Sequence, residues 1–236
     1  MNIHGLTKFT LIDYPQKIAS IIFAGNCNFI CPYCHNPFLV VDSESQPLIP
    51  NDDFYRFLDS RVGKIDAVVI SGGEPTLSKG IFSLALEIKK RGFLVKLDTN
   101  GSRPKVVREL YENNCLDFIG VDYKGPKTKY NFISGTNELG LYEKITETIS
   151  YIISIKISYD IRTTVHKALL SEHDIITMRA ELSNLGVKNW ILQRFNPTEV
   201  IDEELKNIPT YSDIELLDII QNLPNTQIRS TKNLMP

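Results

Sequence analysis

The segment Gly25–Pro37 constrains the chain most, because it contains three of the four cysteines. Cys27, Cys31 and Cys34 follow a C-x3-C-x2-C spacing, which supplies three thiolates for one cubane cluster. Clusters that only transfer electrons normally have four cysteine ligands, and zinc sites usually combine paired C-x2-C ligands or histidines. The spacing therefore predicts a [4Fe-4S] cluster in which one iron has no protein ligand.

Three other interpretations fit the same cysteines. A zinc ion can bind three thiolates and one histidine, which would be His35 or His4. Two of the thiols can form a redox disulfide, or all three can be buried without a shared role. The remaining cysteine, Cys115, lies near the end of an expected helix and is predicted to have no function at the site.

Tyr33 stands immediately before Cys34, and with this aromatic residue the cysteine spacing resembles the radical S-adenosylmethionine (SAM) superfamily. The resemblance implies that SAM binds the fourth iron through its amino and carboxylate groups. It implies that the reduced cluster cleaves SAM to methionine and a 5′-deoxyadenosyl radical. It also implies that Tyr33 contacts the cofactor and that no side chain is catalytic beyond the cluster and SAM.

Length and composition predict one domain. A chain of 236 residues with 42% hydrophobic residues can bury the core of a single α/β domain, and no low-complexity linker divides it. We expect one domain over residues 1–236, with the cluster loop at 24–37 and a mostly polar C-terminal tail from about 198 to 236.

Charge and hydropathy exclude several classes of partner. A formal net charge of −2 does not predict general binding to nucleic acid or to a membrane surface. No long apolar stretch and no signal peptide occur, and clustered thiols suit a reducing compartment. The prediction is a cytoplasmic protein.

Short apolar runs alternate with amphipathic stretches along the chain. The runs predict strands, and the amphipathic stretches predict helices, six of each. Six strand-helix units predict right-handed crossovers and a parallel sheet, yet they are fewer than the eight of a closed barrel. The resulting fold class is an α/β partial (β/α)6 barrel with parallel strands, as in the radical SAM family. The expected strands are 18–23, 67–70, 93–97, 118–121, 160–165 and 190–195, and the expected helices are 51–61, 79–91, 104–113, 137–153, 171–185 and 212–222.

Gly72, Gly73 and Glu74 follow the second predicted strand. Two glycines let the backbone approach a ligand closely, and the carboxylate can bind a cationic group. The resemblance implies that this motif holds the SAM amino group. The alternative is an ordinary strand-helix turn.

Two further strand ends narrow the resemblance to activases of glycyl-radical enzymes. They are Asp98-Thr99-Asn100-Gly101 and Asp122-x-Lys124. The resemblance implies that Asp98, Thr99 and Asp122 can hold a monovalent cation through hard oxygen donors. It also implies that Lys124 and the Asp98–Asn100 segment contact the cofactor.

The last two predicted strands add weaker candidates. Arg162 and Thr164 alternate with apolar neighbours, so both are expected to face the interior, where a buried arginine needs an anion. The SAM carboxylate is the expected partner. Gln193 and Asn196 lie where the pyruvate formate-lyase activases have a histidine near adenosine, which argues against that subgroup.

Three segments together resemble the activating proteins of anaerobic ribonucleoside-triphosphate reductases: Gly5–Pro15, Cys34–Pro37 and Leu97–Gly101. One departure is Gln16, where a glycine is expected. The resemblance implies a glycyl-radical reductase as partner and flavodoxin or ferredoxin as electron donor. The rivals are a radical SAM enzyme for a small molecule, such as a deazapurine synthase, and a non-catalytic iron-sulfur or zinc protein. The remaining histidines, His4, His166 and His173, are expected to be structural or on the surface.

Overall fold

The computed structural model describes residues 1–229 and forms two compact units. Unit 1 contains residues 1–28 and 36–120, and unit 2 contains residues 29–35 and the chain from 121 onward. The single domain expected over 1–236 stays a prediction. Residues 230–236 of the expected C-terminal tail lie outside the described residues.

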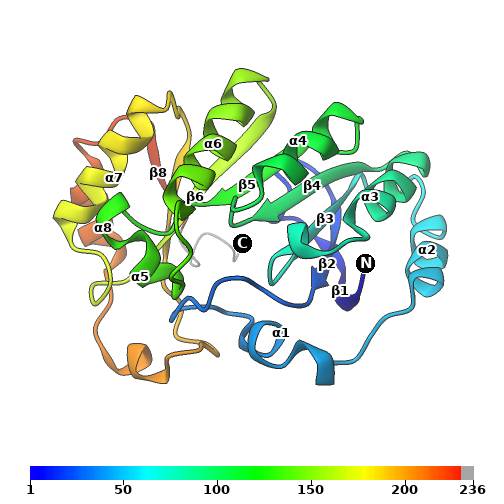
Figure 1. Cartoon of the computed structure of the whole chain (residues 1–236), viewed down its shortest axis with the longest axis horizontal. Helices are drawn as coiled ribbons and strands as arrows, with labels where there is room; N and C mark the ends of the chain where they lie inside the picture. Colours follow the sequence, from blue (N-terminus) through cyan, green and yellow to red (C-terminus); the bar gives the residue numbers. More distant parts are fainter. Residues whose placement is uncertain (230–236) are drawn as a thin grey trace. The chain divides into compact units, whose positions relative to one another are not determined.

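Unit 1 is built on parallel strands with one antiparallel neighbour (Figure 1). β2 (Ala19–Ala24), β3 (Ala67–Gly72) and β4 (Leu94–Thr99) are parallel, and β5 (Phe118–Asp122) runs from unit 1 into unit 2. β1 (Ile3–Thr10) pairs antiparallel with β2 and was not predicted. Only the first and last residues of β1 are buried, so the strand lacks the apolar run that identifies a buried strand.

Unit 1 has four α-helices, of which α2, α3 and α4 have buried apolar side chains and α1 has none. They are α1 (Pro37–Val41), α2 (Asn51–Asp59), α3 (Ile81–Lys90) and α4 (Pro104–Glu112), with short 3-10 turns at Ser43–Ser45 and Pro75–Leu77. α3 buries Ile81, Leu84, Ala85 and Ile88, as its predicted periodicity requires.

The sequence predicts Asn51 or Asp52 as the N-terminal cap of helix α2, and neither residue occupies that position. Its capping position is Pro50, and no side chain caps it. Asn51 therefore opens the first turn, where Asp52 and Asp53 follow. The negative carboxylates of Asp52 and Asp53 interact favourably with the positive end of the helix dipole. This interaction stabilises the start of the helix in place of a side-chain cap.

The strands of unit 1 enclose an apolar layer. Side chains from β2, β3 and β5 pack with a tyrosine from the loop after β1, and the buried members of this cluster are Tyr14, Ala19, Ile21, Ala67, Val69 and Phe118. Paired positions on parallel strands point to the same face, and Val69 pairs with both Ile21 and Lys96. Lys96 therefore lies in one row with Val69 and Ile21, and this row of side chains is otherwise apolar.

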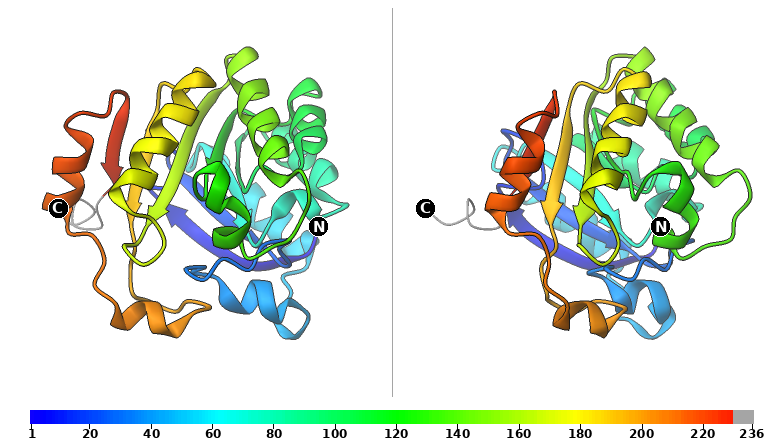
Figure 2. Two further views of the ribbon diagram at one scale, coloured as in Figure 1. Left: turned by 60° about the vertical axis from the view of Figure 1, so that its left-hand side comes forward. Right: turned by 90° about the vertical axis from the view of Figure 1, so that its left-hand side faces the viewer.

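Unit 2 also has parallel strands, β6 (Ser158–Val165), β7 (Trp190–Arg194) and β8 (Thr226–Arg229). Figure 2 shows α7 (Glu172–Asn184) alongside β6 and β7. The predicted starts of α7 and α8 (Asp213–Ile220) are confirmed, because Ser171 and Ser212 each form a capping box.

The other elements of unit 2 are α6 (Leu141–Ser154), α5 (Tyr130–Ser134) and two 3-10 turns at Lys127–Lys129 and Glu203–Asn207. The sequence did not predict α5 or β8, since both are too short to show a period of their own. Helix α6 begins at Leu141 rather than at the predicted residue 137 because Gly140, in the left-handed conformation, precedes it.

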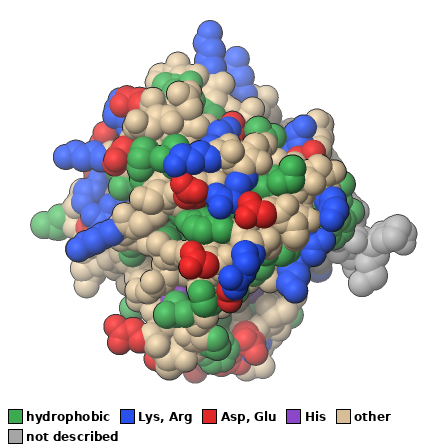
Figure 3. Space-filling view, turned by 90° about the vertical axis from the view of Figure 1, so that its right-hand side faces the viewer, with side chains coloured by type: hydrophobic (Ala, Val, Ile, Leu, Met, Phe, Trp, Pro, Cys, Tyr) green, Lys and Arg blue, Asp and Glu red, His purple; other side chains and the backbone are tan. Residues whose placement is uncertain are grey.

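No helix within residues 1–229 is long and apolar enough to span a membrane. The face in Figure 3 carries Lys and Arg side chains interspersed with Asp and Glu side chains. On this face the charges form no single-sign stripe, in agreement with the near-zero net charge.

Candidate functional site

The glycines after β3 pack against the start of the cysteine segment. A Cβ on Gly72, whose φ is +123°, would lie 2.3 Å from the backbone N and O of Ala24. A Cβ on Gly73 would lie 2.1 Å from the carbonyl oxygen of Asn26. The Gly73 and Glu74 amides donate to the Ala24 and Asn26 carbonyls at 2.8 and 2.7 Å. Both positions need glycine because two backbone segments meet there.

Glu74 links the turn after β3 to the turn after β4. Its side chain is buried, and its Oε1 accepts hydrogen bonds from the Thr76 amide at 3.0 Å, the Thr99 hydroxyl at 2.7 Å and the Thr76 hydroxyl. Its Oε2 accepts from the Asn100 amide at 2.7 Å. Burial raises the pKa of Glu74, and these hydrogen bonds oppose that rise. The Glu74 carboxylate therefore links the two turns in the absence of any ligand. Its Oε2 atom can still accept one more hydrogen bond, from a ligand.

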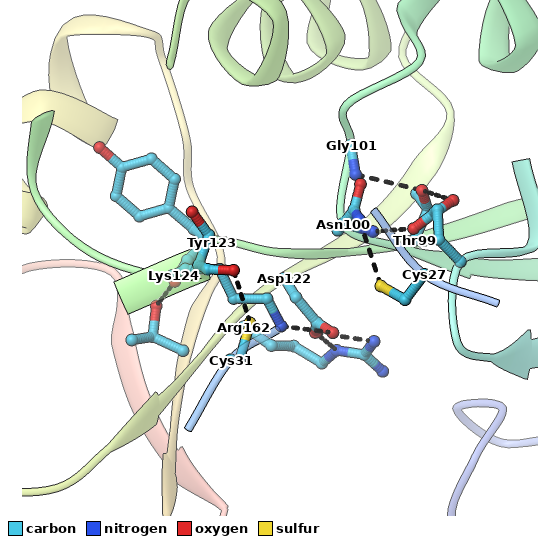
Figure 4. Close-up of polar contacts among 12 residues, drawn as sticks. Cys27, Cys31, Thr99, Asn100, Gly101, Asp122, Tyr123, Lys124 and Arg162 are labelled. Carbon is cyan, nitrogen blue, oxygen red and sulfur yellow. Dashed lines mark hydrogen bonds and ion pairs between the residues drawn. The ribbon is translucent and has the colours of Figure 1, made fainter. Parts of the chain in front are cut away.

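Asn100 connects the turn after β4 to the cysteine segment (Figure 4). Its Nδ2 donates to Asn28 Oδ1 at 2.9 Å and lies 4.0 Å from Cys27 Sγ, and its Oδ1 accepts from the Ser102 amide. Asn28 in turn donates to the Ser102 hydroxyl at 3.0 Å. The network places an amide N–H beside the first cysteine sulfur.

Asp98 and Thr99, predicted to hold a monovalent cation, both have protein partners within unit 1. Asp98 Oδ1 lies 2.6 Å from Lys96 Nζ, and the two side chains are 10% and 2% exposed. A monovalent cation 4 Å from that ammonium would be repelled by roughly 4 kcal/mol at an effective dielectric constant of about 20. Sequence reasoning missed Lys96, although a lysine between Val95 and Leu97, two residues before Asp98, is visible in the printed sequence.

In unit 2, the end of α5 holds the second part of the cysteine segment. The Ile30 amide donates to the Ser134 carbonyl at 2.9 Å, and Cys31 Sγ lies 3.9 Å from the same oxygen. Gly135 is left-handed, and a Cβ there would lie 2.2 Å from the Ile30 oxygen. Cys34 folds back onto Cys31 through a 3.0 Å backbone hydrogen bond.

Burial raises the pKa of the Cys31 thiol to about 11, against the lowering effect of the Lys124 charge. Binding to iron or zinc requires the thiolate, so a metal would displace this proton. None of the four cysteines forms a disulfide within the described residues. No three His, Cys, Asp or Glu side chains within residues 1–229 are grouped closely enough to hold a metal ion. The cluster assignment therefore depends on the cysteine spacing and on the family.

Asp122, Lys124 and Arg162 form a charged triad in unit 2 (Figure 4). Arg162 Nε and Nη2 each lie 3.0 Å from Asp122 Oδ1, and Lys124 Nζ lies 3.3 Å from Oδ2. Burial opposes ionisation of Asp122, but the charges of Arg162 and Lys124 outweigh it and lower the pKa of its carboxyl to about 2. Two cations share one carboxylate, so the triad keeps a net charge of +1 and can bind an anion.

Arg162 is buried, as predicted, and Asp122 supplies an anionic partner within the protein. Thr164 of β6 pairs with Gln193 of β7, so these two candidates lie side by side on one face. Tyr33 is 4% exposed, and its hydroxyl has no hydrogen-bond partner within the described chain. The Lys124 ammonium lies 5.7 Å from the centre of the Tyr33 ring. An unpartnered buried hydroxyl fits a site that is completed by a ligand.

His35, His166 and Cys115 each contact a backbone carbonyl. His35 Nε2 lies 3.0 Å from the Asn196 carbonyl oxygen, and the fully buried His166 contacts the Leu205 carbonyl at 3.2 Å. His173 is exposed. Cys115 is fully buried, with its sulfur 3.4 Å from the Asn113 carbonyl.

Comparison with known proteins decides the family. Residues 21–176 match the family model of the Radical SAM superfamily. The chain belongs to this superfamily. Membership implies a [4Fe-4S] cluster and SAM as cofactors, and the donor chemistry of the three cysteines fits such a cluster.

Two relatives show the range of functions among similar proteins. A candidate glycyl-radical enzyme activating enzyme of Methanocaldococcus jannaschii is 32% identical over 220 residues, which is 92% of this chain and 89% of the relative. An AdoMet-dependent heme synthase of Methanosarcina barkeri is 28% identical over 201 residues, which is 82% of this chain and 54% of the relative.

Solved structures confirm the fold. Streptococcus suis SuiB bound to S-adenosylmethionine matches 89% of this radical SAM chain with a TM-score of 0.66 and 18% identity. The match covers 49% of the SuiB chain, so the present chain spans about half its length. SuiB has also been solved bound to the precursor peptide SuiA. The predicted fold class, the partial (β/α)6 barrel of radical SAM proteins, is confirmed.

Proposed function

We propose that this chain is a glycyl-radical-enzyme activase, and that its partner is an anaerobic ribonucleoside-triphosphate reductase. One electron and SAM would yield methionine and a 5′-deoxyadenosyl radical. This radical would take the Cα hydrogen atom of a partner glycine, which would leave 5′-deoxyadenosine and a glycyl radical. The main support is the 32% identity to a candidate activase over 92% of the chain.

Cys27, Cys31 and Cys34 are the proposed cluster ligands. Each end of this set is held by its own unit: the turn after β3 anchors Ala24 and Asn26, and α5 anchors Ile30. The first contacts hold the backbone next to Cys27 within unit 1, and the second hold the backbone next to Cys31 within unit 2. When bound, the cluster supplies the single electron that SAM cleavage requires.

The charged triad is the proposed anchor for the SAM carboxylate. Asp122 pairs with both Lys124 and Arg162, so the three side chains together carry a net charge of +1. A carboxylate can accept charge-assisted hydrogen bonds from both cations. The remaining proposed cofactor contacts are Tyr33, Gly72, Gly73, Glu74, Asp98, Thr99, Asn100, Thr164 and Gln193.

The amino group of SAM is the proposed ligand of the turn after β3. Glu74 Oε1 is engaged by three donors, whereas Oε2 accepts only the Asn100 amide among the described contacts. A carboxylate oxygen can accept two hydrogen bonds, so Oε2 is the atom that would receive the ammonium.

A radical SAM enzyme for a small molecule is the second candidate. It is favoured by the heme synthase relative, which matches 82% of this chain. Such an enzyme would cleave SAM when its metabolite is added. An activase would do so when its partner protein is added, with flavodoxin or ferredoxin as the proposed electron donor.

The deciding experiment is an EPR measurement on the reduced, cluster-loaded protein with SAM and a candidate anaerobic reductase. We expect a glycyl-radical signal on the reductase and more 5′-deoxyadenosine than the activase makes alone. A reductase variant with alanine at the radical glycine serves as control, since it should bind without giving the signal. Stimulation of SAM cleavage by a small metabolite, with no signal on any reductase, would contradict the proposal.

The Asn100 side chain is expected to raise the midpoint potential of the cluster. The Asn100→Leu variant removes the amide donor beside Cys27 Sγ. Hydrogen bonds to cluster sulfurs favour the reduced, more negative state. Loss of about 1 kcal/mol should lower the midpoint potential by about 40 mV in an EPR-monitored redox titration without SAM. Asn113→Leu, at the exposed end of α4, is the control. An unchanged potential in Asn100→Leu would rule out this hydrogen bond.

A further inference from the structure

Lys96 is a charged residue in an apolar layer. It stands in the middle of β4, pairs with Val69 on β3, and its ammonium lies 5.7 Å from the centre of the Phe118 ring. The side chain is only 2% exposed. Burying an ammonium is unfavourable unless an anion accompanies it, and here Asp98 lies 2.6 Å away. The pair follows from strand alternation, because residues two apart point to the same side.

Asp98 belongs to the motif for which the activase resemblance implies a soluble monovalent cation. Such a cation needs carboxylate and hydroxyl oxygens with free lone pairs. Asp98 Oδ1 already contacts an ammonium. The Thr99 hydroxyl donates to Glu74 at 2.7 Å and accepts from the Gly101 amide at 3.1 Å. The described donor set of unit 1 therefore does not fit a second cation next to Lys96.

We propose that Lys96 is the resident cation of this site. Its ammonium, fixed by the fold, takes the place that Na⁺ or K⁺ would occupy on Asp98. SAM binding by this chain is then independent of the monovalent cation in solution. Lys96 acts as a positioning residue through Asp98. The inference depends on the proposed SAM site.

The first test uses the wild-type protein with its cluster reconstituted. The affinity for SAM is measured by equilibrium dialysis with labelled SAM in potassium, sodium and choline chloride at equal ionic strength. We expect the three dissociation constants to agree within about twofold. Choline is too large to occupy a cation site between two side chains, so a tenfold weaker affinity in choline would overturn the inference.

The second test removes the ammonium. Lys96→Met leaves Asp98 without its charge partner, and SAM affinity should become at least tenfold weaker in choline than in potassium. Lys96→Arg keeps a cation and should remain independent of the salt. The control is Lys105→Met, which changes an exposed lysine on α4. A purely structural role would lower stability in every salt alike.

The outcomes separate the two proposals. If Lys96→Met binds SAM equally in potassium and choline, Lys96 is not the resident cation. If Lys96→Met does not fold, the salt dependence of SAM affinity in the wild type and in Lys96→Arg still tests whether Lys96 is the resident cation. If the wild-type protein needs K⁺ to bind SAM, only this inference is overturned. If the wild-type protein binds no SAM in any salt, both this inference and the proposed function are overturned.

Discussion

Replacing Cys27, Cys31 or Cys34 with alanine is expected to abolish the four-iron cluster in the reconstituted protein. In the proposed cluster the fourth iron has no protein ligand, so the three thiolates would be all that the chain contributes and none would be spare. We expect the iron-sulfur absorbance and the iron content to fall at least tenfold in each variant.

Cys115→Ala is the matched control for these variants. Its thiol is fully buried and contacts the Asn113 carbonyl, outside the C-x3-C-x2-C segment. It should keep the full cluster. Loss of the cluster in Cys115→Ala together with its retention in any of the other three would show that the ligands are assigned wrongly. A zinc protein would instead bind one zinc ion per chain and show no iron-sulfur absorbance.

Glu74→Ala is expected to destabilise the protein even without any cofactor. The substitution leaves four buried donors without their acceptor, from Thr76, Thr99 and Asn100. Removing one partner from a buried, charge-assisted network typically costs about 3–5 kcal/mol. The free energy of unfolding of the cofactor-free protein should fall by about that amount in urea titrations followed by circular dichroism.

Glu112→Ala provides the comparison, because it removes an exposed carboxylate at the end of α4. We expect its unfolding free energy to stay within about 0.5 kcal/mol of wild type. A loss below about 1 kcal/mol in Glu74→Ala would mean that the four hydrogen bonds contribute little. Glu74 would then matter only for the ligand, as the resemblance alone implies.

Much of the fold could be predicted because its strands are buried on both faces. The apolar runs before Gly72, Thr99 and Asp122 are short and sharply bounded, so the sequence places β3, β4 and β5 within two residues. Helix starts with a side-chain cap, at Ser171 and Ser212, were also predictable. β1 was missed because an antiparallel strand with few buried residues has no such run.

The candidate site was predictable in its residue types but not in its pairings. Cysteine spacing and the polar residues at strand ends are local features, so they can be identified directly in the sequence. The partner of a buried charge depends on strand register instead. Arg162 was expected to need an anion from a ligand, yet Asp122, 40 residues earlier, lies 3.0 Å from it.

The sequence by itself determined the family resemblance, the C-x3-C-x2-C spacing of the cysteines and the alternation of six strands with six helices, because each of these is encoded by spacing or period along the chain. Only the tertiary structure decided that Glu74 is held by the turn after β4, that Lys96 neutralises Asp98, and that Asp122 joins Lys124 to Arg162. The reason is physical. A charge removed from water must be compensated by whichever group the packed strands place within about 3 Å, and no local pattern specifies that group.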